Sequence, residues 1–166
     1  LVFSRFGVMF FIDPVQAFTN IRWALRRNGR LTFVCWQAQD KNEWAQIPLN
    51  AALQYVQPPT PAAPGAPGPF AFADPQRVRH LLESAGFKDV TLESYEAQLS
   101  MGGAVNVEEA ADFALEIGVV ARLVMEASTE VRNQVAQAIR EALLPYTSAK
   151  GVQLGGAAWI VSAQPV

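Results

Sequence analysis

The sequence predicts an α/β fold that starts with a β-α-β unit in residues 1–36. Three features support it: a buried apolar strand ending near LVF, a helical pattern after Asp13, and a second apolar run at residues 31–36. A β-α-β crossover places its two strands parallel in one sheet and almost always winds right-handed. Ligands of open α/β sheets bind beyond the carboxyl ends of the strands, so the residues after each strand are the first candidates for a site.

The helix of this unit is expected to begin at Asp13. The Asp13 carboxylate can accept a hydrogen bond from a free N–H group of the first turn, and Pro14 suits the first helical position because no donor is needed there. An apolar stripe at helical spacing follows, formed by Phe18, Ile21 and Leu25. These features predict an amphipathic helix packed on the sheet.

The next residues predict the end of the helix and the second strand. Arg26 and Arg27 would lie in the last helical turn, where the helix dipole favours cations, and Gly29 can adopt the left-handed conformation of a helix end. Residues 31–36 are apolar with one exception, which is typical of a parallel strand covered on both faces. Cys35, the one cysteine, is expected to be an inert thiol in the core.

Later parts of the chain add a helix and two strands. Asp74 precedes a proline as Asp13 does, and Gly86 closes the helical pattern that follows. Residues 87–99 are expected to form a strand near the sheet edge, because one of its faces is polar. Residues 157–163 predict a short apolar strand that joins the same sheet.

Two insertions separate these elements, at about residues 37–73 and 101–150, within a single domain over residues 1–166. The first insertion is expected to hold a helix over residues 42–56 that Pro48 breaks. The proline-rich loop PPTPAAPGAPGP follows it. The second insertion is expected to hold three short helices, each with one apolar stripe.

The helices of the second insertion have their own start and stop signals. Asn106 is expected to cap the first helix, with two glutamates in the first turn, where negative charge is favoured. Gly118 is expected to end or bend that helix. Ser128 or Thr129 is expected to cap the last one.

The composition excludes several function classes. A net charge of -2 gives no electrostatic footprint for nucleic acid. One histidine and one cysteine cannot form a zinc site of His and Cys ligands, and His80 is expected on the surface or in helix packing rather than in catalysis. No apolar run is long enough for a membrane span, so a cytoplasmic protein is expected. No feature indicates an oligomeric state.

The pattern SRFGVMFF-DP-AF-NIR-ALR-GR-L-FVCW resembles the middle of a class I S-adenosylmethionine-dependent methyltransferase, of the small-molecule type related to quinone-biosynthesis methyltransferases. The segment GPFAFADPQRVRHLLESAGFKDV resembles the helix and strand that usually follow, and LGGAAWIVSAQPV resembles the closing antiparallel strand. The resemblance implies the C-terminal half of a Rossmann-like methyltransferase sheet, with parallel strands, a final antiparallel strand and helical insertions.

One departure from that family concerns the cofactor. The family has a Gly-rich turn after its first strand and an acidic residue at the end of its second, and neither motif is present in this sequence. The resemblance therefore implies a truncated C-terminal portion of an enzyme that is inactive by itself and lacks half of its site for S-adenosylmethionine.

The resemblance also implies site residues. Ser4, Arg5 and Phe6 follow the first strand, where the family contacts cofactor and substrate. Phe6 could face the sulfonium through a cation–π contact, and Ser4 and Arg5 could bind the cofactor or an acidic substrate group. The alternative is that Arg5 is a solvated loop residue and Phe6 fills the core.

A pocket for a small-molecule substrate is expected from four apolar side chains, Met9, Trp36, Trp44 and Phe70. These side chains could equally form the core under the first insertion. No general base is evident, so no catalytic residue is assigned. The expected function is methyl transfer to a small, apolar acceptor, and the alternative is a non-catalytic binding or scaffold domain of the same fold. A nicotinamide-dependent Rossmann enzyme is a third possibility, but its Gly-rich fingerprint is also absent from this sequence.

Overall fold

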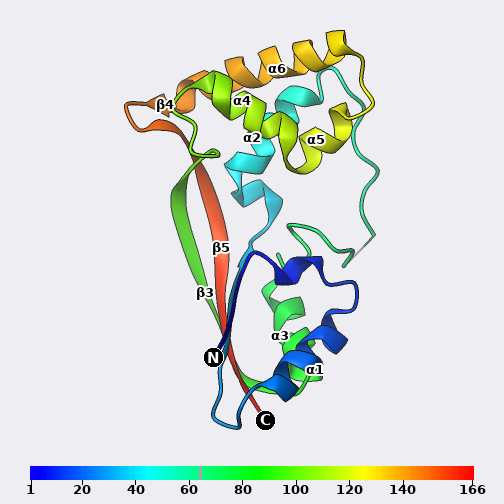
Figure 1. The fold of residues 1–166 in the computed structure, drawn as a ribbon, viewed down its shortest axis with the longest axis vertical. Coiled ribbons are helices and arrows are strands. Elements are labelled where there is room, and N and C mark those ends of the chain that lie inside the picture. The colour runs from blue at the N-terminus through cyan, green and yellow to red at the C-terminus, as the bar shows by residue number, and fades with distance from the viewer. Residues whose placement is uncertain (64) are drawn as a thin grey trace. The chain divides into compact units, whose positions relative to one another are not determined.

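The computed structural model describes residues 1–63 and 65–166 of the chain (Figure 1). Pro64, in the predicted proline-rich loop, lies outside the described residues, and the described residues of that loop contain no helix or strand, as expected. The chain divides into two compact units. The first unit comprises Leu1–Gln39, Ala62–Glu96 and Ala157–Val166, and the second comprises Asp40–Pro61 and Ala97–Gly156. The single-domain organisation with two insertions stays a prediction.

A sheet of mixed direction confirms the predicted α/β class. Its main strands lie in the order β1 (Val2–Arg5), β2 (Leu31–Trp36), β5 (Gly151–Pro165) and β3 (Phe87–Ser100). β1 pairs in parallel with β2, as the crossover predicts, and β5 is antiparallel to β2. β3 lies at one edge of the sheet, also as predicted.

Two strands differ from the prediction. β5 starts at Gly151 rather than near residue 157, because its first residues pair with β4 (Thr147–Ser148), a short strand that the sequence did not predict. β1 is not a buried strand. It lies at the other edge of the sheet, where Leu1 is 84% exposed and Phe3 is 61% exposed.

Both Asp-Pro sequences start a helix as predicted, α1 (Pro14–Ala24) and α3 (Pro75–Ser84). The carboxylates of Asp13 and Asp74 each accept a hydrogen bond of 2.9 Å from a backbone N–H of the first turn. Gly86, with a φ of +84°, follows α3 in the left-handed conformation that closes a helix.

The end of α1 differs from the prediction. The chain becomes extended at Leu25, so Arg26 and Arg27 lie outside the helix, and Gly29 does not cap it. The Gly29 N–H donates instead to the Arg26 carbonyl at 2.7 Å. This contact closes a reverse turn that leads directly into β2, and the chain has to leave the helix before Arg26 to form it.

β2 is fully buried on one face only. The side chains of Leu31, Phe33 and Cys35 are inaccessible to solvent, whereas the alternate side chains are half-buried. The helices α1 and α3 both pack on the buried face, through Phe18 and Leu82 among others (Figure 1). The predicted burial on both faces is therefore wrong, because the two helices of the first unit cover the same face.

The second unit is a helical cluster with its own core (Figure 1). Its helices are α2 (Glu43–Ala52), α4 (Val107–Glu116), α5 (Gly118–Val124) and α6 (Thr129–Leu143). α4 ends at Glu116 and α5 begins at Gly118, which has a φ of +77°, so the helical path ends near this glycine as predicted. α2 continues through Pro48 without the predicted break. Proline removes one backbone donor, and burial of Pro48 within the packed unit stabilises the helix against that loss. The shorter 3-10 helices are η1 (Val8–Phe10), η2 (Gln39–Lys41) and η3 (Leu144–Tyr146).

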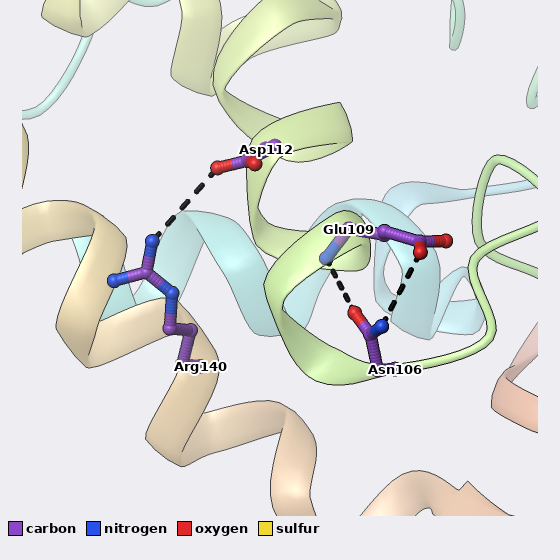
Figure 2. Close-up of polar contacts among 4 residues, drawn as sticks. All are labelled: Asn106, Glu109, Asp112 and Arg140. Atoms are coloured by element: carbon purple, nitrogen blue, oxygen red, sulfur yellow. Dashed lines mark hydrogen bonds and ion pairs between the residues drawn. The ribbon is translucent and has the colours of Figure 1, made fainter.

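The predicted caps in the second unit are present. Asn106 accepts a hydrogen bond of 2.9 Å from the Glu109 N–H and donates to the Glu109 carboxylate at 3.2 Å (Figure 2). Ser128 caps α6 by accepting a hydrogen bond of 3.3 Å. An ion pair of 3.8 Å between Arg140 and Asp112 joins α6 to α4 (Figure 2).

Candidate functional site

The carboxyl ends of β1 and β2 lie side by side in the first unit, which is where a ligand of an open α/β sheet binds. Arg5 is in register with Val34 at the end of the parallel pair. The next residue, Phe6, donates its N–H to the Val34 carbonyl at 3.0 Å, which continues the ladder by one step. Trp36 is the last residue of β2. We refer to Arg5, Phe6, Trp36 and the following Gln37 as the carboxyl edge.

The aromatic rings of Phe6 and Trp36 stack at this edge. Their centroids are 4.0 Å apart and their planes differ by 15°. Phe6 has a φ of +55°, a left-handed conformation that few residues other than glycine adopt. Such a conformation costs on the order of 1–3 kcal/mol and tends to occur at functional sites. The structure therefore places a strained aromatic residue at the position that sequence reasoning assigned to cofactor contact.

The buried Met9 contacts the backbone of Trp36. Its sulfur accepts a hydrogen bond of 3.4 Å from the Trp36 N–H, and the Met9 side chain is buried. The Met9 carbonyl accepts a hydrogen bond of 3.1 Å from the N–H of Gly68, which brings the segment that carries the half-buried Phe70 next to η1. Met9, Trp36 and Phe70, three of the four predicted pocket residues, thus belong to the first unit.

The fourth predicted pocket residue, Trp44, belongs to the second unit. Its indole N–H donates to the side-chain oxygen of the buried Asn42 at 2.9 Å, and its ring packs against the core of that unit. The neighbouring Glu43 accepts a hydrogen bond of 2.6 Å from the Gly155 N–H. Trp44 therefore has contacts within its own unit.

Ser4 and Arg5 were predicted to follow the first strand, but both lie within β1. Successive side chains of a strand point to opposite faces, so these two do not converge on one ligand atom. Ser4 is in register with the buried Phe33, on the face that the helices cover, whereas Arg5 is exposed on the other face. Of the two, Arg5 is the one available to a ligand.

Gln37 is the buried polar residue that sequence reasoning missed. Its side chain is 1% exposed, and its amide nitrogen donates to the Ser94 hydroxyl at 2.7 Å and to the Ala158 carbonyl at 2.9 Å. Its backbone N–H donates to the Ala157 carbonyl at 3.0 Å. A buried amide has to be satisfied by hydrogen bonds, so Gln37 joins the end of β2 to β5 and β3. A polar residue directly after an apolar strand was the available sequence signal.

Cys35 and His80 take no part in the carboxyl edge. Burial raises the pKa of the Cys35 thiol to about 12, which confirms an inert core thiol, and His80 is exposed on α3 as expected. Within residues 1–63 and 65–166, no three His, Cys, Asp or Glu side chains lie together so as to hold a metal ion. No helix formed by those residues is both long and apolar enough to cross a bilayer.

Among known proteins, the chain is similar only to proteins of solved structure. No family model and no curated protein matches the chain. A candidate methyltransferase from Bacillus halodurans C-125 has 16% identity and a TM-score of 0.49, with 99% of this chain and 69% of that chain covered.

Two structures of phosphoethanolamine N-methyltransferase 2 from Haemonchus contortus are also similar. One is in complex with phosphomonomethylethanolamine and S-adenosylhomocysteine and the other with S-adenosyl-L-methionine. Each has 12% identity and a TM-score of 0.41, and the match covers 99% of this chain but 33% of the methyltransferase. The chain therefore spans about a third of that methyltransferase, and likeness of this degree assigns it to no family.

Proposed function

We propose that this chain contributes to methyl transfer from S-adenosylmethionine to a small, apolar acceptor. It would do so as the C-terminal portion of a class I methyltransferase related to the quinone-biosynthesis type. The observation that carries the proposal is the stacked pair of Phe6 and Trp36 at the carboxyl edge. Aromatic faces attract cations, and the sulfonium is the cationic centre of this cofactor.

The residues of the carboxyl edge fit the sulfonium end of the cofactor. Phe6 and Trp36 offer aromatic rings, and the exposed Arg5 offers a cation to a carboxylate of the cofactor or of the substrate. When bound, the cofactor supplies the methyl group. The chain's own part is to position the cofactor and the acceptor, which is the main source of rate in such a transfer.

The adenosine end of the cofactor requires residues that residues 1–166 do not provide. The glycine that follows β1 is Gly7, and a Cβ atom there would lie 3.2 Å from the Ser4 hydroxyl oxygen, so the Ser4 side chain already occupies the space beside this glycine. Gln37 and the two residues after it carry no carboxylate for a ribose. The proposal therefore includes a further protein segment, with a Gly-rich turn and an acidic residue, that completes the site. It assigns no general base.

Calorimetric titration of S-adenosylmethionine and S-adenosylhomocysteine tests the proposal. Both are titrated into residues 1–166 and into a protein extended upstream along the reading frame. Micromolar binding by the extended protein alone is the expected result. Equal binding by residues 1–166 would contradict the proposal that a further segment completes the cofactor site. Binding by neither protein would favour the non-catalytic scaffold.

The two ligands also test the role of the aromatic pair, because S-adenosylhomocysteine is a neutral thioether. A cation–π contact is worth on the order of 0.5–2 kcal/mol, so in the extended protein Trp36→Leu should lower the preference for S-adenosylmethionine about two- to thirtyfold. Trp23→Leu, which changes an exposed tryptophan of α1, is the matched control. An unchanged preference in Trp36→Leu would show that the sulfonium does not bind at the carboxyl edge.

A further inference from the structure

The most basic segment of the chain lies between α1 and β2. Four of the 13 Lys and Arg residues fall within residues 22–30, and residues 14–39 contain no Asp or Glu. This stretch therefore carries a local charge of +4 in a chain whose net charge is -2. The concentration of one sign of charge in a short segment creates a local potential that attracts an anionic partner.

Three of these arginines are available to a partner. Arg22 is half-buried, with its guanidinium against Gly86, so it is part of the packing. Arg26, Arg27 and Arg30 are exposed, and none of them forms a side-chain hydrogen bond or an ion pair with another residue in the described part of the chain.

The backbone holds these three arginines close together. The reverse turn closed by the hydrogen bond from the Gly29 N–H to the Arg26 carbonyl contains Arg26 and Arg27, and Arg30 follows it directly. Trp23 lies in the last turn of α1, immediately before this turn, and is 69% exposed. We call Trp23, Arg26, Arg27 and Arg30 the basic turn.

We propose that the basic turn docks on an anionic phospholipid surface. The planar guanidinium forms paired hydrogen bonds with phosphate oxygens. An exposed indole, apolar with one N–H donor, suits the boundary between headgroups and acyl chains. Anionic leaflets attract basic residues near the surface. The binding would be peripheral, and it is independent of the proposed methyl transfer.

Nucleic acid also presents phosphates, but the observations favour lipid. Proteins that bind nucleic acid are usually basic over the whole domain, whereas this chain has an isoelectric point near 5.4. A flat lipid surface can be contacted by one short exposed turn. Its charge is joined by an exposed indole that can enter the interface.

Co-sedimentation with unilamellar vesicles tests the proposal. The chain should bind phosphatidylcholine vesicles that contain about 30% phosphatidylserine, should not bind pure phosphatidylcholine vesicles, and should dissociate at about 0.5 M salt. Each arginine contributes roughly fivefold to partitioning, so the triple variant R26Q/R27Q/R30Q should lose on the order of a hundredfold. In the wild-type chain, tryptophan fluorescence should shift to the blue on binding, and Trp23→Phe should reduce that shift.

The triple variant R122Q/R132Q/K150Q is the matched control, because it removes the same charge from exposed positions of the second unit. It should bind the vesicles like the wild-type chain. Equal loss in both triple variants, or equal binding to uncharged vesicles, would overturn the proposal. Tighter binding to a labelled single-stranded oligonucleotide than to vesicles, abolished by R26Q/R27Q/R30Q, would reassign the basic turn to nucleic acid. Circular dichroism of both variants checks that the fold is retained.

Discussion

The Gln37 side chain donates a hydrogen bond of 2.7 Å to the Ser94 hydroxyl and thereby joins the end of β2 to β3. The same amide donates to the Ala158 carbonyl of β5 at 2.9 Å. Gln37→Leu removes this donor and leaves the carbonyl of the buried Ala158 without it. It should lower the free energy of unfolding by about 1–3 kcal/mol, measured by urea denaturation followed by tryptophan fluorescence.

The control for this substitution is Gln134→Leu, on the exposed side of α6. A surface change of this kind should alter the free energy of unfolding by less than about 0.5 kcal/mol. A similar loss in the two variants would show that the buried hydrogen bonds of Gln37 do not stabilise the sheet.

The left-handed conformation of Phe6 predicts an unusual order of stabilities. Phe6→Gly and Phe6→Ala both remove the ring that stacks on Trp36, so both should be less stable than the wild-type chain. Glycine adopts a φ of +55° without the steric cost that alanine incurs. The glycine variant should therefore be more stable than the alanine variant by about 1–2 kcal/mol in urea denaturation.

In a helix or strand interior the same comparison has the opposite sign, because glycine loses more conformational freedom on folding. Ala17 in α1 provides that control, since Ala17→Gly should be destabilising. An alanine variant at Phe6 that is more stable than the glycine variant would contradict a left-handed Phe6.

Features set by neighbouring residues could be predicted from the sequence. The caps at Asp13 and Asp74 and the parallel pair of β1 and β2 depend on a few adjacent side chains and on a short crossover. The position of Phe6 at the carboxyl edge follows from the same crossover. The proposed ligand of that edge depends on the family resemblance and awaits the titrations above.

Features set by distant contacts could not be predicted. The continuity of α2 at Pro48 depends on burial in the second unit, and the role of Gln37 depends on Ser94 and Ala158. The exposed edge position of β1 likewise depends on which strands enter the sheet. No local pattern contains this information, because each partner lies far along the chain.

Burial of Cys35 predicts a specific dependence on pH. Desolvation raises the pKa of the Cys35 thiol from 9.0 to about 12 in the folded chain. Above pH 9 the unfolded chain loses this proton while the folded chain keeps it. The contribution of the thiol to stability is therefore complete below pH 9 and decreases as the pH rises from 9.0 to about 12.

Two measurements check this behaviour. The free energy of unfolding should decrease between about pH 9 and 11 more steeply in the wild-type chain than in Cys35→Ala, which has no titrating thiol. At neutral pH, a thiol reagent should label the folded chain far more slowly than the urea-unfolded chain. Rapid labelling under native conditions would show that Cys35 is accessible and that its thiol is not held in the core.

The caps and the ion pair of the second unit should differ in importance. Asn106 accepts a hydrogen bond from the Glu109 N–H at the start of α4, so Asn106→Ala should cost about 1 kcal/mol and Asn106→Ser, which keeps a capping oxygen, should cost little (Figure 2). The Arg140–Asp112 pair is 3.8 Å long, with the Asp112 side chain 67% exposed, so Asp112→Asn should cost well under about 1 kcal/mol. Urea denaturation at low and high salt separates the two, because only the ion pair should weaken as salt screens it. A larger, salt-sensitive loss in Asp112→Asn than in Asn106→Ala would mean that the ion pair, and not the cap, holds α4 in place.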